Sequence, residues 1–233
     1  MEQVLETYEK KLDLLNPVIC FDERPCQLIN DVLAPVGPTS SSVRKIDYEY
    51  ERNGTACILM AVEPLTGKRV VQVCKRRTKK EYSKFMQNLV KKYPHASKIT
   101  LVQDNLNTHN PSSFYENMEP AAALELTNRF NLVYTPKKAS WLNMAEIELS
   151  AISRQCLNKR IGSFCKLKAE VGSWTKNRNK NKTKINWQFT NLKAREKFEK
   201  RYDEVKNYCY GALVGLNLPV ALPEKQSRGG NTF

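Results

Sequence analysis

The sequence is poor in the residues that build zinc sites. It has only two histidines, His95 and His109, and its seven cysteines form no Cys-x-x-Cys pair. Zinc sites use such ligands at close spacing, so a zinc site of this kind is excluded. An odd, scattered set of cysteines instead favours reduced thiols that fill the core.

Long apolar runs are also missing. No stretch of about 18 apolar residues occurs, and residues 1–17 are charged and lack the apolar segment of a secretory signal. We therefore expect no membrane contact and a cytoplasmic location. Glycine and proline are scarce, at 9 and 11 of 233 residues, while 41% of the residues are hydrophobic, which allows one sizeable domain with a buried core.

Acidic residues are outnumbered by basic ones. The chain has 24 Asp and Glu against 38 Lys and Arg, a formal net charge of +14 that favours a polyanionic partner. Two basic clusters stand out, "KRVVQVCKRRTKK" at 68–80 and "KNRNKNKTK" at 176–184. A solvated loop accounts equally well for any single lysine of the second cluster, but the block as a whole favours contact with phosphate.

The apolar pattern predicts strands first, and later strands that alternate with helices. This order implies a mixed sheet with helices on its faces. Asn53-Gly54 is the strongest short hairpin signal in the chain, so we expect a turn there. The expected elements, in order, are a helix at 2–15, a strand at 18–22, two strands flanking 53–54, a strand at 69–74, a helix at 79–93, a strand ending at 104, a helix reaching 129, a strand at 131–135 and a helix opening near 143.

Three carboxylates occupy positions where they can converge. Asp22 and Asp104 each end an apolar strand, and Glu146 lies in the first turn of a helix. Carboxylates held together repel one another unless a cation lies among them, and an all-oxygen set suits Mg²⁺. Two such ions, roughly 3.5–4 Å apart, activate water or a 3′-hydroxyl for attack on phosphorus, which is phosphodiester chemistry.

Simpler interpretations of the same residues exist. Asn143 and Glu146 have the spacing of a capping box, in which Asn143 caps the helix and Glu146 reaches back to its backbone N–H. Asp104 could cap a turn, Asp22 could pair with Arg24, and His109 could be an ordinary hydrogen-bonded loop histidine. Taken from spacing alone, the capping box is the favoured interpretation of Glu146.

A family resemblance changes this balance. "VQDNLNTHNP" and "YTPKKASWLNMAEIELSAISRQCL", with "VICFDERPCQL" before them, closely resemble the catalytic domain of DDE transposases of the mariner superfamily, in the bacterial insertion-sequence branch. The similarity runs from about residue 16 to 203. The spacing of 41 residues between Asp104 and Glu146 is longer than in the best-known mariner elements but fits this branch.

The resemblance implies an α/β fold of the ribonuclease-H-like type, with a mixed five-stranded sheet and helices on both faces. It carries over Asp22, Asp104 and Glu146 as catalytic residues and as ligands of two Mg²⁺ ions, for which Mn²⁺ can substitute. His109 and Asn143 are expected to support these ligands. The residues expected to hold the DNA backbone are Lys75, Arg76, Arg77, Lys137, Lys138, Lys176, Arg178, Lys180, Lys182 and Lys184.

The implied activity is cleavage of double-stranded DNA at terminal inverted repeats, followed by strand transfer into target DNA, typically at TA. We expect a lead-in helix at 1–17, the catalytic domain at 18–207 and a tail at 208–233. Residues 1–17 hold no helix-turn-helix domain, so a helix-turn-helix partner polypeptide is expected, together with a homodimer on DNA near the bacterial nucleoid. The alternatives are a non-catalytic DNA-binding remnant that partners a full transposase, and another ribonuclease-H-like nuclease.

Overall fold

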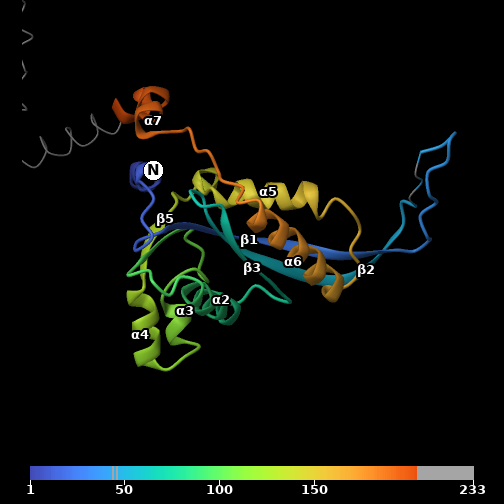
Figure 1. Ribbon diagram of the computed structural model, residues 1–233, viewed down its shortest axis with the longest axis horizontal. Helices are drawn as coiled ribbons and strands as arrows, with labels where there is room; N and C mark the ends of the chain where they lie inside the picture. The colour runs from blue at the N-terminus through green and yellow to red at the C-terminus, as the bar shows by residue number, and fades with distance from the viewer. Residues whose placement is uncertain (44, 46, 204–233) are drawn as a thin grey trace, which may run out of the picture. The chain divides into compact units, whose positions relative to one another are not determined.

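The computed structural model describes residues 1–43, 45 and 47–203 (Figure 1). The chain divides into two compact units between Gln188 and Phe189. The first unit holds the sheet and the predicted catalytic residues. In the second unit, α7 (Asn191–Lys197) begins after Thr190, whose side chain accepts a hydrogen bond from the backbone N–H of Lys193. The predicted boundary at 207 and the tail at 208–233 lie outside the described residues.

The first unit is built on one mixed sheet of five strands in the order β3-β2-β1-β4-β5. β2 is antiparallel to both β1 and β3, whereas β4 runs parallel to β1 and β5 runs parallel to β4. The predicted mixed five-stranded sheet is therefore confirmed. The strands are β1 (Val18–Asp31), β2 (Tyr50–Glu63), β3 (Lys68–Cys74), β4 (Ile99–Gln103) and β5 (Phe130–Tyr134).

Helices cover both faces of this sheet (Figure 1). One face packs on α2 through a core that includes Phe21, Leu59 and Phe85, and the other packs on α5 and α6 through Met60 and Ile152. No helix of the described part is long and apolar enough to cross a membrane. The helices of this unit are α1 (Glu2–Glu9), α2 (Lys79–Lys91), α3 (Ser112–Tyr115), α4 (Pro120–Asn128), the 3₁₀ turn η1 (Ser140–Leu142), α5 (Ala145–Gln155) and α6 (Phe164–Lys180).

The predicted turn at Asn53-Gly54 is wrong. Both residues lie inside β2, which runs unbroken from Tyr50 to Glu63, and they sit opposite Leu28 where the β1–β2 register shifts. Gly54 has φ +93°, so its conformational freedom is used in a β-bulge. A bulge and a tight hairpin both require a residue with positive φ, and the local sequence does not distinguish them.

Two predicted helices are shorter than expected. The first ends at Glu9, because the side chain of Asp13 accepts hydrogen bonds from the backbone N–H groups of Leu15 and Asn16 and holds a turn in place of a further helical turn. The helix expected to reach 129 is divided into α3 and α4, and Pro120 starts the second of these.

Candidate active site

Two of the predicted carboxylates lie side by side at one level of the sheet. Asp22 is the fifth residue of β1, and Asp104 directly follows the last residue of β4. The two strands pair in parallel with Cys20 opposite Val102. Asp22 and Asp104 each come two residues later, so the same register places them opposite each other. The convergence expected from the two apolar strands is present in the fold.

The third carboxylate comes from the helix above this edge. Glu146 lies in the first turn of α5, and its side chain is exposed. Burial raises the pKa of Asp22 to about 7; a hydrogen bond from the backbone of Glu23 lowers it, the charges of Glu146 and Asp104 raise it, and His109 lowers it. The electrostatic influence of Glu146 and Asp104 on Asp22 places all three acids in one neighbourhood.

The three carboxylates do not form a closed cluster. Within the part of the chain that the structure describes, no group of three His, Cys, Asp or Glu side chains is gathered tightly enough to hold an ion as it stands. Each acid still presents oxygens for a ligand. The Asp104 side chain is 31% exposed and only its Oδ1 is engaged, and the side chain of Glu146 has no hydrogen bond or ion pair to a described residue. This all-oxygen donor set fits a hard divalent cation.

His109 holds Asp104 in place. The imidazole is fully buried, its Nδ1 contacts Oδ1 of Asp104, and its Nε2 lies 3.1 Å from Oε2 of Glu23. Burial lowers the pKa of His109, but the hydrogen bonds and charges of Asp104 and Glu23 outweigh this effect and raise it to about 9. A second residue, Gln103, donates to the backbone carbonyl of His109 at 2.7 Å and fixes the loop.

An aromatic cluster surrounds this histidine. The ring of Tyr82 stacks on His109 with centroids 5.1 Å apart, and the ring of Phe21 meets it edge-on at the same distance. The hydroxyl of Tyr82 donates to Oε1 of Gln103 at 2.9 Å. Tyr82 of α2 therefore contacts both Phe21 and Gln103, the residues immediately before Asp22 and Asp104.

Asn143 connects β1 to the start of α5. Its Nδ2 donates to the carbonyl of Phe21 at 2.8 Å and lies 3.4 Å from Oδ2 of Asp22, while its Oδ1 accepts from the backbone N–H of Ala145. Its own backbone N–H donates to the carbonyl of Ser140, so Glu146 does not close a capping box. The capping-box interpretation is wrong, and the carboxylate of Glu146 remains available.

The lead-in helix supports the same loop. The hydroxyl of Tyr8 donates to the carbonyl of Leu142 at 2.8 Å and lies 3.4 Å from the backbone nitrogen of Met144. This contact joins α1 to the segment that carries Glu146. No local pattern marks Tyr8 for this contact, because Leu142 and Met144 are 134 and 136 positions away.

The predicted DNA-contacting cations differ in their freedom. Lys137 and Lys138 are exposed just before η1. Arg77 lies 2.9 Å from Glu23, and Arg178 lies 2.7 Å from Glu148, so both guanidinium groups already have a carboxylate partner. The other predicted cations are exposed: Lys75, Arg76, Lys176, Lys180, Lys182 and Lys184. Lys180 is the last residue of α6, and Lys182 and Lys184 follow the helix.

Two charged residues whose pairing the sequence did not indicate form a buried ion pair between β3 and α5. Arg69 of β3 donates through Nε to Oε2 of Glu148 at 2.7 Å, and both side chains are almost fully buried. Because Glu148 lies in α5 two residues after Glu146, this pair anchors the helix that carries Glu146 to the sheet. Their separation of 79 positions leaves no local signal by which they could have been found.

Comparisons with known proteins agree with this fold. The fold resembles the Mos1 mariner paired end complex with Mn (TM-score 0.52, 16% identity, 76% of this chain and 52% of that chain) and the Mos1 strand transfer complex (TM-score 0.50, 16% identity, 75% and 51%). This chain thus spans about half the length of those chains, and the likeness confirms the ribonuclease-H-like fold. Among curated protein sequences none matches. The family model described as DDE superfamily endonuclease matches residues 17–168, and the chain belongs to that family.

Proposed function

We propose that this chain is the catalytic domain of a DNA transposase. It would cut DNA strands at the ends of a mobile element and join the freed 3′-hydroxyl groups to target DNA. The observation that carries the proposal is the position of Asp22, Asp104 and Glu146 around one edge of the sheet, where burial first, and then the charges of the other two acids, raise the pKa of Asp22. The family assignment weighs against a non-catalytic remnant.

In this proposal Asp22, Asp104 and Glu146 hold two Mg²⁺ ions, which Mn²⁺ can replace. Such ions, when bound, activate the attacking oxygen and stabilise the leaving oxygen at phosphorus. The side chain of Glu146, exposed and without a partner in the described part, is able to rotate toward Asp22. His109 and Asn143 are positioning residues that fix the orientations of Asp104 and Asp22.

The DNA substrate would be double-stranded, with terminal inverted repeats and a target that contains TA. The exposed cations Lys75, Arg76, Lys137 and Lys138 would contact phosphates, which position the duplex without reading its sequence. A helix-turn-helix partner polypeptide would read the repeats, and two copies of the chain would act as a homodimer. We retain residues 18–207 as the catalytic domain and the bacterial cytoplasm as its location.

The decisive experiment is nicking of a supercoiled plasmid by the purified chain with Mg²⁺ or Mn²⁺. The wild type should nick the plasmid, and Glu146→Gln should not, although it should still bind DNA. Glu125→Gln, an exposed glutamate of α4, is the matched control and should nick as the wild type does. If Glu146→Gln nicked at the wild-type rate, the proposed catalytic role of this acid would be lost.

A further inference from the structure

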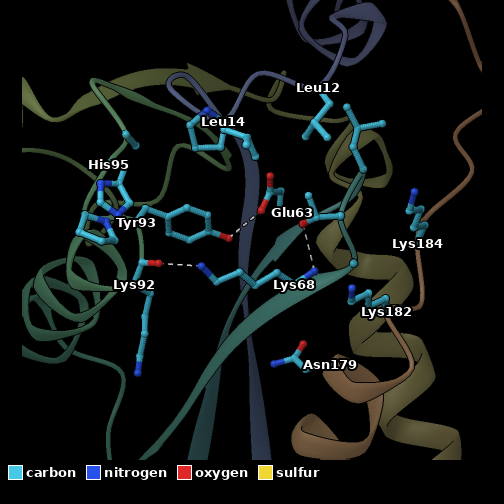
Figure 2. Close-up of a pocket in the computed structure, with 16 residues that line it drawn as sticks. Leu12, Leu14, Glu63, Lys68, Lys92, Tyr93, His95, Asn179, Lys182 and Lys184 are labelled. Atoms are coloured by element: carbon cyan, nitrogen blue, oxygen red, sulfur yellow. Dashed lines mark hydrogen bonds between the residues drawn. The ribbon is translucent and has the colours of Figure 1, made fainter.

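A second cavity lies away from the carboxylates. It measures about 660 Å³ and is lined by residues from 12–17, the β2–β3 turn, the end of α2 and 179–184 (Figure 2). Side chains alternate between the two faces of a strand. Met60, which pairs with Asp22, faces α5, whereas Leu59 and Ala61 face α2, and Glu63 follows their alternation. The side chain of Glu63 thus points to the face of the sheet opposite to that of Asp22.

The floor of the cavity carries a buried carboxylate with one oxygen unused. Glu63 is only 4% exposed. Its Oε2 accepts a hydrogen bond from the hydroxyl of Tyr93 at 3.1 Å, but its Oε1 has no hydrogen-bond partner among the described residues. Figure 2 shows this second oxygen turned away from Tyr93. A buried acceptor without a donor is unfavourable, so a ligand that brings an N–H group would be stabilised here.

The nearest ammonium does not satisfy this oxygen. Lys68 donates through Nζ to the carbonyl of Lys92 at 2.6 Å and lies 3.7 Å from the centroid of the Tyr93 ring. Figure 2 shows its side chain passing alongside Glu63 toward Lys92. The carboxylate therefore keeps an open acceptor while a positive charge remains close by.

One wall of the cavity presents two cations on a rigid support. Lys182 and Lys184 line the cavity, and Lys182 has φ +45°, a left-handed conformation that is uncommon outside glycine. The segment is held by a hydrogen bond from the backbone N–H of Ile185 to the carbonyl of Pro64 at 3.0 Å. Gly67 packs so closely on it that a Cβ there would lie 2.7 Å from the carbonyl oxygen of Thr183.

We propose that this cavity binds a nucleotide whose base carries an exocyclic amino group. The amino group of adenine, cytosine or guanine can donate to the free oxygen of Glu63, and the phosphate can contact Lys182 and Lys184. The ring has apolar walls at Leu12, Leu14 and Leu65. Thymine fits poorly, because its single ring N–H lies between two carbonyl oxygens that would face the carboxylate.

The nucleotide has two sources with the same chemistry: a free mononucleotide, or an unpaired nucleotide of a DNA strand. Either one would contact Glu63, which lies away from Asp22. Binding here requires neither metal nor strand cleavage, so this inference goes beyond the proposed transposase activity and can fail or succeed independently of it.

The test is calorimetric titration of the full chain, without divalent metal, with dAMP, dCMP, dGMP and dTMP. The loss of one charge-assisted hydrogen bond corresponds to about tenfold in affinity, so the three amino-bearing nucleotides should bind about tenfold more tightly than dTMP. A single-stranded oligonucleotide that competes more strongly than the mononucleotide would identify a DNA strand as the source. An oligonucleotide that competes more weakly than the mononucleotide would identify the free nucleotide as the source. Both results support nucleotide binding in the cavity.

Variants locate the binding. Glu63→Gln keeps the shape and an acceptor for Tyr93 but offers an amide, so it should lose the discrimination against dTMP. Lys184→Ala, at an exposed position where folding is not at risk, should weaken the binding of all amino-bearing nucleotides by a similar factor. The control Lys168→Ala, at an exposed position outside the cavity, should bind them as the wild type does. Equal binding of all four nucleotides, no binding, or wild-type affinity in Lys184→Ala would overturn the proposal.

Discussion

The Nε2 atom of His109 lies 3.1 Å from the Oε2 atom of Glu23, a contact between residues 86 positions apart. The other ring nitrogen contacts Asp104, so both nitrogens of the imidazole face a carboxylate. This arrangement favours the doubly protonated ring, which can donate to both acids. It also fixes the direction in which Asp104 presents its remaining oxygen.

His109→Ala should therefore impair metal use more than folding. Loss of a residue that orients a metal ligand typically costs about 10–100-fold in metal affinity or activity. The measurement is the plasmid nicking rate as a function of Mn²⁺ concentration, with circular dichroism to verify the fold. His95→Ala replaces the other histidine, which is exposed, and serves as the control. If His109→Ala nicked at the wild-type rate and needed no more Mn²⁺ than the wild type, the positioning role of His109 would be contradicted.

Asn143→Ala should lower both stability and nicking. The buried amide donates to the carbonyl of Phe21 and accepts from the N–H of Ala145, and truncation leaves these groups unpaired at a cost of about 1–3 kcal/mol each. Urea denaturation measures the first effect, and nicking in the cold, where the variant is still folded, measures the second. Full nicking by a folded Asn143→Ala would show that Asp22 does not need this support.

The ion pair of Arg69 and Glu148 predicts a loss of stability in acid. Burial raises the pKa of Glu148, but hydrogen bonds from Arg69 and Arg178 outweigh this effect, and its pKa lies below the usual value. A carboxyl group with a lower pKa in the folded state contributes stability above its unfolded pKa, and this contribution disappears as pH falls through the folded pKa. Urea denaturation at a series of pH values should show the wild type losing stability below about pH 4.3, the ordinary glutamate pKa.

Glu148→Ala isolates this contribution. Removing one partner of a buried ion pair leaves an uncompensated charge on Arg69 and costs about 3–5 kcal/mol at neutral pH. The difference in stability between the wild type and Glu148→Ala should shrink in acid. A difference that stayed constant down to the lowest pH at which both proteins fold would argue against the pair as its source.

Lys137 and Lys138 should contribute to DNA binding in a way that Arg178 does not. If both lysines contact phosphates, the double change to alanine should reduce the slope of log K against log salt by about 1.8, since each contact contributes about 0.9. Arg178→Ala should mainly destabilise the protein, because its guanidinium is paired with Glu148. Filter binding over a salt series gives the slopes, and equal slopes for the wild type and the double variant would exclude these lysines as contacts.

Two glycines with positive φ form a matched pair for a stability test. Gly54 has φ +93° and open space where a Cβ would lie, whereas Gly67 has φ +73° and a Cβ there would meet backbone atoms of residues 182 and 183. Gly54→Ala should cost about 1–2 kcal/mol from backbone strain alone, and Gly67→Ala should cost more. Thermal unfolding should give a lower melting temperature for Gly67→Ala than for Gly54→Ala, and equal melting temperatures would contradict this prediction.

The sequence predicted the strands that bring Asp22 and Asp104 to one edge of the sheet, because the signals for them are local. An apolar strand that ends in Asp104 and another that carries Asp22 can be recognised within a few residues, and so can the helix start at Glu146. Glu23 and Arg69 were missed, because each acquires its meaning from a partner far along the chain. Gly54 was assigned to the wrong structure, because a positive φ serves a bulge as well as a turn.

Tyr82 reaches the residues before both strand-borne acids, through its ring at Phe21 and its hydroxyl at Gln103. Through these two contacts Tyr82 fixes the spacing between Asp22 and Asp104. A displacement of α2, whatever its cause, would change that spacing without any contact to DNA. The spacing of the two acids consequently depends on packing in the hydrophobic interior, one layer beneath the surface where the substrate would bind.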